Sequence, residues 1–266
     1  MRKACLILFA ALLTLSACEW GKPPVAEENI FTDTLTYQYK TISERGPDCG
    51  NKPDSDCTHI TIKYPEFKGH ANLNDTIKSK LLNIFMAEKP DTSFSEYTKN
   101  FINQYIEFKK DDPRTDIFFV LESYSKVVLQ DSGLVTLEIG GYNFQGGAHG
   151  GAYTGYINWD TKADKNLTLD DILTDGYHTD LTKIAEGLFR KEEKLTDTSS
   201  LANDYFFKDN RFALNENFLV TPLGLKFLYN QYEIKPYAAG QTELLVPYAQ
   251  IKKLMRPNTV VSHYVK

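Results

Sequence analysis

The chain has 266 residues, of which 42% are hydrophobic, and a formal net charge of -5 at pH 7. This size and composition are those of a globular protein with a sizeable core, built as one large domain or as two packed halves. The acidic balance argues against nucleic acid or an anionic lipid surface as a partner, because neutralising phosphates requires clustered Lys and Arg. It favours a cationic partner instead.

The N-terminus predicts a lipoprotein signal peptide. Two basic residues precede an apolar run at residues 6–15, which is too short to span a bilayer. Small residues then lead directly to Cys18, a pattern that resembles a bacterial lipobox; an ordinary signal-peptide cleavage site is the weaker alternative. We expect residues 1–17 to be removed, which changes the formal charge from -5 to -7 because two positive charges leave with them. Cys18 would then carry the lipid, and residues 18–30 would tether the folded part to a membrane.

The cysteine content agrees with an exported protein. Cys5 lies in the expected signal peptide and Cys18 is the expected lipidation site, which leaves Cys49 and Cys57. The short Gly-, Pro- and Asp-containing loop between them predicts a disulfide, which would stabilise the fold by about 2–3 kcal/mol. A zinc site that includes His59 is the alternative, although this spacing matches no standard tetrahedral pattern.

The first half of the chain predicts two strands followed by two helices. Polar residues alternate with branched or aromatic ones at 34–42 and 58–64, on either side of the cysteine loop. Apolar residues then recur at helical spacing from Leu73 to Phe85. A second helix should begin at the capping-box sequence of residues 93–96, and its aromatic stripe is typical of a core-facing side.

From residue 116 onward the hydrophobic period changes to two. Segments 117–130, 134–144 and 151–160 predict an antiparallel meander, and a third helix should follow near residues 180–194. The stretch 218–255 predicts further strands and a short closing helix that begins at Pro247. Helices and strands are segregated, so we predict an α+β fold of antiparallel sheets with packed helices, in two intimately associated subdomains.

The sequence contains no G-x-S-x-G, H-E-x-x-H, phosphate-loop or C-x-x-C motif, so we predict no enzymatic activity, no cofactor and no metal. The glycine-rich segment 140–155 has strand-like flanks, which indicates a turn and not a dinucleotide site. His149 in this turn has two interpretations. It is a general base or a ligand, with Asp160, Asp170 and Asp171 as possible orienting carboxylates, or it is a hydrogen-bonding turn residue. The pair Asp170 and Asp171 is more typical of a helix N-terminal cap than of a glycosidase site.

Two motifs carry a resemblance to a known family. They are GGAHG at residues 146–150 and YEIKPYAAG at residues 232–240, with NLTLDDIL between them. In this order they resemble the extracytoplasmic domain pair shared by RsiV-type anti-sigma factors and the N-terminal region of PdaC-type deacetylases. The resemblance implies a PdaC-like subdomain at 31–150 and an RsiV-like subdomain at 151–260, with an α+β fold and no established catalytic activity.

The resemblance also implies a partner, because RsiV-type receptors bind lysozyme through loop residues of this domain. We find no sigma-binding segment, membrane helix or deacetylase domain, and therefore expect neither RsiV-type signalling nor PdaC chemistry. Pro236 and Tyr237 would form a stiff contact loop, unless Tyr237 folds onto the core. The predicted binding residues are Tyr237, Pro236, Lys235, His149 and Tyr153.

Three hypotheses follow for a lipid-anchored protein of the bacterial envelope, on its periplasmic or extracellular face. The first is binding of lysozyme or a related muramidase. The second is direct binding of peptidoglycan or another glycan, which the many aromatic residues favour. The third is a hydrolase or deacetylase that uses His149.

Overall fold

A computed structural model describes residues 34–85, 91–131 and 133–265. The predicted signal peptide at residues 1–17, the lipidated Cys18 and the tether at residues 18–30 lie outside these ranges and stay predictions. Among the helices of the described ranges, none combines the length and the apolarity needed to cross a bilayer.

Six strands form the first sheet in chain order. All neighbouring strands in it are antiparallel except β2 and β3, which run parallel. We expected antiparallel pairs only; the parallel pair arises because two helices carry the chain back along the sheet before β3 begins. The strands are β1 (Tyr37–Arg45), β2 (His59–Phe67), β3 (Val120–Asp131), β4 (Leu134–Phe144), β5 (Gly151–Asp160) and β6 (Lys165–Asn166).

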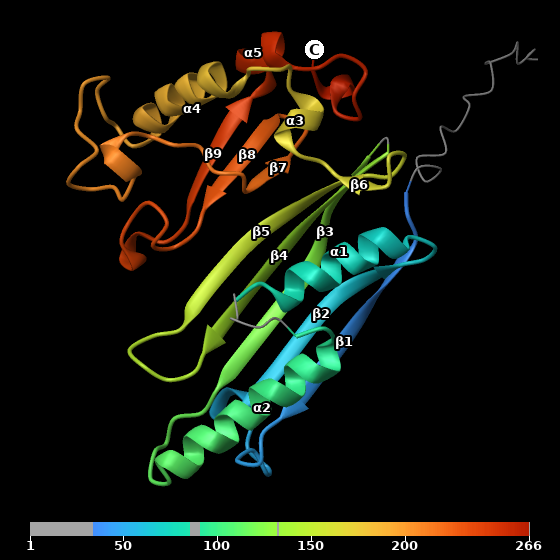
Figure 1. Ribbon diagram of the computed structural model, residues 1–266, viewed down its shortest axis with the longest axis vertical. Helices are drawn as coiled ribbons and strands as arrows, with labels where there is room; N and C mark the ends of the chain where they lie inside the picture. Colours follow the sequence, from blue (N-terminus) through green and yellow to red (C-terminus); the bar gives the residue numbers. More distant parts are fainter. Residues whose placement is uncertain (1–33, 86–90, 132, 266) are drawn as a thin grey trace, which may run out of the picture. The chain divides into compact units, whose positions relative to one another are not determined.

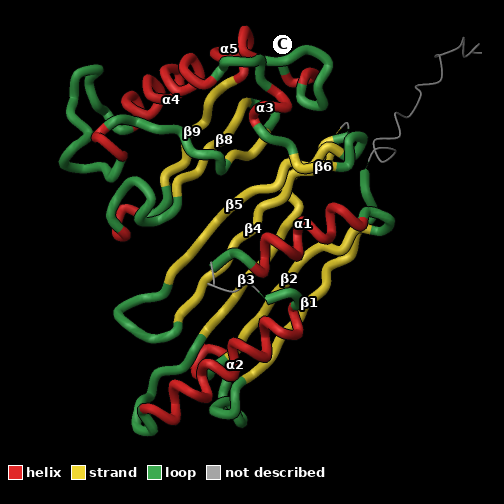
Figure 2. The backbone as a smooth tube through the Cα atoms, in the orientation of Figure 1, coloured by secondary structure: helices red, strands yellow, loops and turns green. Residues whose placement is uncertain are grey.

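The helices α1 (Ala71–Leu82) and α2 (Phe94–Asp111) cover the same face of this sheet (Figure 1; Figure 2). The predicted apolar stripes point inward, because Leu73, Ile77 and Phe101 are buried in the core between helices and sheet. This first core also contains Leu121, Leu137 and Ile157 from the inward positions of β3, β4 and β5. The alternate positions of the same strands therefore face away from the helices.

The start of α2 follows the predicted capping motif in part. The Ser93 hydroxyl accepts a hydrogen bond from the Glu96 backbone N–H at 3.1 Å. The Glu96 carboxylate accepts from the backbone N–H and the hydroxyl of Thr92, at 3.0 and 2.8 Å, and not from the Ser93 N–H that a capping box would use. The Glu96 side chain therefore caps the N–H of the residue before the one that the capping box predicts.

Three strands form the second sheet, in the order β7, β8, β9, and all pairs are antiparallel. Its core lies under α4 and contains Phe189, Phe227 and Val246. The elements of this half are drawn in yellow to red in Figure 1, and apart from the short additional helix α3 they agree with the predicted order of helix, strands and closing helix. They are α3 (Leu169–Ile172), α4 (His178–Glu192), β7 (Phe218–Val220), β8 (Gly224–Tyr229), β9 (Thr242–Pro247) and α5 (Tyr248–Ile251).

Asn158 joins the two sheets. Its side chain is buried, donates to the Phe218 carbonyl at 2.8 Å and accepts from the Val220 N–H at 2.8 Å. β7 is an edge strand, so this amide occupies the position that a neighbouring strand would take. A small apolar contact of Tyr156, Leu219 and Leu228 lies beside it.

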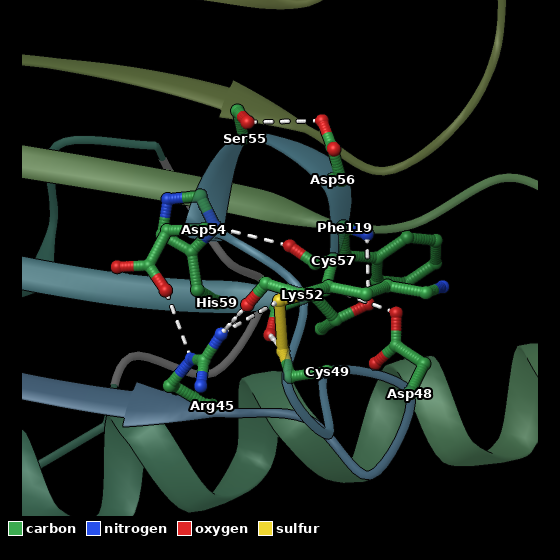
Figure 3. Close-up of a disulfide and its surroundings, with 11 residues drawn as sticks. Arg45, Asp48, Cys49, Lys52, Asp54, Ser55, Asp56, Cys57, His59 and Phe119 are labelled. Atoms are coloured by element: carbon green, nitrogen blue, oxygen red, sulfur yellow. Dashed lines mark hydrogen bonds and ion pairs between the residues drawn. A yellow bond between two sulfur atoms is a disulfide. The ribbon is translucent and has the colours of Figure 1, made fainter.

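The predicted disulfide is confirmed: Cys49 and Cys57 are bonded, with their Cα atoms 4.9 Å apart (Figure 3). Both thiols are therefore unavailable as zinc ligands. Further local contacts fix the loop, since Arg45 pairs with Asp54 at 2.8 Å and the Asp48 carboxylate accepts the Thr58 N–H at 2.9 Å.

Mixed helix and strand content in separate blocks confirms the predicted α+β class. The described residues belong to one compact unit. The subdomain ranges 31–150 and 151–260 stay a prediction; β5, on the C-terminal side of that boundary, is hydrogen-bonded to β4 in the first sheet.

Candidate functional site

Three aromatic rings from distant parts of the sequence meet on the surface and form what we call the ring cluster: His149, Tyr232 and Tyr237. His149 comes from the loop between β4 and β5, and both tyrosines come from the connection between β8 and β9. The His149 ring stacks on Tyr237, with centroids 4.1 Å apart and planes at 20°. Tyr232 lies 5.5 Å from Tyr237 by centroids and 6.1 Å from His149. The two motifs noted in the sequence therefore touch in space.

Hydrogen bonds define the tautomer of the neutral His149 ring. Nδ1 lies 2.9 Å from the carbonyl oxygen of Gly150, which can only accept, so Nδ1 carries the hydrogen. Nε2 is then an acceptor and lies 3.2 Å from the Tyr232 hydroxyl. The imidazole is held at both nitrogens and on one face, which makes it a rigid part of the surface.

Glycines give the loop before His149 its shape. Gly146 and Gly147 have φ angles of +95° and +97°, in the left-handed region that favours glycine. Gly150 is packed against the Tyr142 ring so closely that a Cβ atom there would overlap it. A side chain at Gly146 or Gly147 would strain the backbone of this loop, and one at Gly150 would displace the Tyr142 ring.

The second segment of the cluster is fastened to the free edge of β5. Asn230 Oδ1 accepts from the Thr154 N–H at 2.8 Å, and Asn230 Nδ2 donates to the Thr154 carbonyl at 2.9 Å. Asn217 donates to the same carbonyl at 2.9 Å. Ile234 is buried in the second core. The exposed Tyr232 thus lies between two anchors, and the half-buried Tyr237 follows the second one by three residues.

A groove of about 440 Å³ lies next to the ring cluster, on the sheet face that points away from α1 and α2. Tyr142 on β4 and Tyr153 on β5, each 38% exposed, both line it. The Gln231 side-chain oxygen is buried without a hydrogen-bond partner among the described residues. We call this feature the tyrosine groove; its lining is Glu122, Tyr124, Gly141, Tyr142, Ala152, Tyr153, Thr154, Gln231 and Gln241.

Burial is the main cause of the raised pKa of two tyrosines that line the groove. It raises the pKa of the Tyr153 hydroxyl, and the nearby Glu233 carboxylate raises it further. Burial also raises the pKa of Tyr124, whose hydroxyl donates to Glu138 at 2.7 Å. Both phenols therefore remain neutral hydrogen-bonding groups at physiological pH.

Comparison with known families accounts for both motifs. Residues 51–152 match the family model described as Deacetylase PdaC, and residues 170–249 match the model described as Protein of unknown function (DUF3298). The chain carries a PdaC domain followed by a DUF3298 domain. His149 lies in the PdaC match and both tyrosines of the ring cluster lie in the DUF3298 match, so the cluster is built by the two domains together.

Two solved structures share the fold. A DUF3298 family protein from Pseudomonas aeruginosa PAO1 is 24% identical, with a TM-score of 0.70 over 85% of this chain and 96% of that one. A DUF3298 family member from Bacteroides fragilis NCTC 9343 is also 24% identical, with a TM-score of 0.71 over 88% and 98%. No curated protein matches the chain. The likeness at this identity shows the fold alone.

The structure places the other predicted binding residues in different settings. Pro236 is exposed and directly precedes the single helical turn Tyr237–Ala239. Lys235 is mostly buried, and its amine pairs with Glu193 at 2.5 Å above the Tyr205 ring. Tyr153 lies in the tyrosine groove and not in the ring cluster. The binding role of all five predicted residues stays a prediction.

The carboxylates considered as partners of His149 have other contacts. Asp160 accepts from the backbone N–H groups of Lys162 and Ala163, both at 2.9 Å. Asp171 accepts from Thr168 at the start of α3, which agrees with the predicted helix cap. Within the described residues, neither carboxylate contacts His149, and no three His, Cys, Asp or Glu side chains gather in a group that could hold a metal ion.

Sequence reasoning missed Tyr232, Tyr142 and Gln231 as parts of the surface. Tyr232 begins the YEIKPYAAG motif and has a φ of +65°, which a tyrosine rarely adopts. Tyr142 could have been found from strand alternation, because it occupies an outward position of β4 opposite Ala152. The position of Gln231 depends on the packing of the two sheets and has no local signal.

Proposed function

We propose that the protein is an extracytoplasmic, lipid-anchored binding protein of the cell envelope that recognises lysozyme or a related muramidase at the ring cluster. The observation that carries the proposal is the stack of surface rings to which the PdaC and DUF3298 matches both contribute. Rigid aromatic side chains supply much of the binding energy in protein interfaces, because they bury a large area at a low cost in conformational entropy.

Charge supports a cationic protein partner. The formal net charge of the chain is -5, and the exposed Glu233 directly follows Tyr232 of the ring cluster. Such an arrangement chiefly raises the rate of encounter with a cationic enzyme and its selectivity. The disulfide supports an extracytoplasmic location, since such bonds persist in oxidising compartments.

The test is the affinity of the purified protein for a cationic lysozyme, measured by biolayer interferometry with wild type and Tyr237→Ala. We expect wild type to bind and Tyr237→Ala to bind about thirtyfold more weakly, because a central aromatic anchor contributes about 2 kcal/mol. The association rate should fall as salt concentration rises.

A matched control is Tyr39→Ala, which removes another exposed tyrosine from β1 in the first sheet. This variant should bind like wild type. Absence of lysozyme binding by wild type, or an equal loss in both variants, would contradict the proposal.

A second candidate, direct glycan binding, is favoured by the tyrosine groove. Tyrosine rings stack on sugars and side-chain amides bond sugar hydroxyls, and both kinds of group line this groove. Co-sedimentation with purified peptidoglycan separates the two candidates. Retention by peptidoglycan that is lost in Gln231→Leu, with no affinity for lysozyme, would replace the first candidate with the second.

An enzymatic role through His149 is the third candidate. Within the described residues no carboxylate contacts its ring, and Nε2 is engaged with Tyr232. Release of acetate or of soluble fragments from peptidoglycan by wild type, and its loss in a folded His149→Ala variant, would favour this candidate over both binding roles.

A further inference from the structure

In Figure 1, α4 lies beside α5 and the turn that follows it. A third surface feature lies along this contact. It is a groove of about 660 Å³, within the range of about 300–1,000 Å³ usual for ligand sites. Its floor is apolar, because Ile184, Leu188 and Leu254 lie half-buried over the second core. We call it the α4 groove; it shares no lining residue with the ring cluster or the tyrosine groove.

Gly187 keeps this groove open. It lies in the interior of α4, where glycine destabilises a helix relative to alanine. No packing contact requires a glycine at this position, since a Cβ atom there would meet nothing within 4 Å. A larger side chain would instead project into the groove. The glycine thus weakens the helix and preserves a space on its surface.

The rim of the groove is positive, although the net charge of the chain is negative. Lys183, Lys191 and Lys253 line it together with one carboxylate, Asp180. All three lysines are exposed, and none of their amines forms an ion pair with a described residue. Lys165, in contrast, is paired with Asp171 at 2.5 Å. The α4 groove therefore offers three free ammonium groups around an apolar floor.

We propose that the α4 groove binds a single-chain anionic lipid, with the acyl chain over Ile184, Gly187 and Leu188 and the anionic headgroup among the lysines. The apolar floor of the groove can bury the acyl chain, and the clustered ammonium groups can donate hydrogen bonds to a carboxylate or phosphate. The site is independent of the ring cluster, so the lipid would be bound in addition to the proposed protein partner.

The experiment is calorimetric titration of the purified protein with dodecanoate below its critical micelle concentration. Wild type should bind, and affinity should rise with acyl length from octanoate to dodecanoate by up to about fourfold per added methylene. Dodecyltrimethylammonium, which has the same chain and the opposite charge, should bind at least about tenfold more weakly.

Two variants test the two halves of the site. Gly187→Leu should lower the affinity for dodecanoate at least about tenfold while its helix stays folded, because leucine favours a helix more than glycine. The triple change Lys183→Glu, Lys191→Glu and Lys253→Glu should abolish binding. Lys99→Glu, on the exposed side of α2, should leave it unchanged.

Several results would overturn the proposal. If Gly187→Leu leaves the affinity for dodecanoate intact, the acyl chain does not bind at Gly187. If the cationic amphiphile binds as tightly as dodecanoate, the lysines do not recognise the headgroup. Flotation with phosphatidylglycerol vesicles that is insensitive to Gly187→Leu, without monomer binding, would make the groove a bilayer contact and not a lipid site.

Discussion

The cores under α1 and α2 and under α4 are filled with apolar side chains, whereas the contact between the two sheets depends largely on amide side chains. Asn158, Asn217 and Asn230 bond backbone groups across this junction. The apolar contacts there are the small cluster of Tyr156, Leu219 and Leu228 and the packing of Leu134 from β4 into the second core. Apolar burial is nondirectional, but hydrogen bonds fix distance and orientation. The cores therefore supply stability, and the junction sets the geometry that brings His149 to Tyr237.

The largest loss of stability should come from the cores. We expect Phe101→Ala in the first core and Phe189→Ala in the second each to lower the free energy of unfolding by about 3–5 kcal/mol, because both rings are buried and leave cavities. Urea denaturation followed by circular dichroism measures the change. A loss below about 1 kcal/mol for either variant would contradict the assignment of that core.

Removing the junction amide should have a smaller effect. Asn158→Ala leaves the Phe218 carbonyl and the Val220 N–H without partners, which should cost about 2–3 kcal/mol of unfolding free energy. The matched control is Asn72→Ala, whose amide bonds Asp164 at the surface and should change stability by no more than about 0.5 kcal/mol. Equal effects of the two variants in urea denaturation would show that the junction does not depend on this bond.

The smallest effect should come from Asp171 at the start of α3, and it should depend on pH. Burial raises the pKa of this carboxyl, but bonds from Lys165 and Thr168 outweigh burial and hold the pKa below its ordinary value of 3.8. The folded protein thus favours the ionised form, so the stabilisation is present above pH 3.8 and is lost as pH falls through the folded pKa.

Asp171→Asn should therefore cost about 1 kcal/mol at pH 7, and this cost should shrink as the pH falls from 7 through the folded pKa. Unfolding free energies of both proteins across this pH range measure the difference. A difference that stays constant with pH would mean that the charge of Asp171 does not contribute.

The sequence predicts the features that depend on neighbouring residues. Spacing alone identified the stripe from Leu73 to Leu81, and the short loop between Cys49 and Cys57 identified the disulfide. These predictions were confirmed because hydrophobic period and loop length act locally. The direction of β3 relative to β2 was not predicted, since it depends on the path of two intervening helices.

The candidate site was only half predictable. Both motifs were found from the sequence, but their contact joins residues 149 and 237 through two sheets and has no local signal. The same limit applies to Lys235, whose partner Glu193 lies 42 residues earlier on a different element. Long-range pairing of polar groups is decided by the packing of the junction, which periodicity does not encode.

The central claim is that His149 and Tyr237 act as one recognition surface across the PdaC and DUF3298 domains. A double-mutant cycle of His149→Ala and Tyr237→Ala on lysozyme affinity tests it most directly. We predict that each single change weakens binding and that the double variant is no more than about twofold weaker than the weaker single variant, since either change breaks the same stack. Fully additive losses, or no loss in either single variant, would contradict the claim.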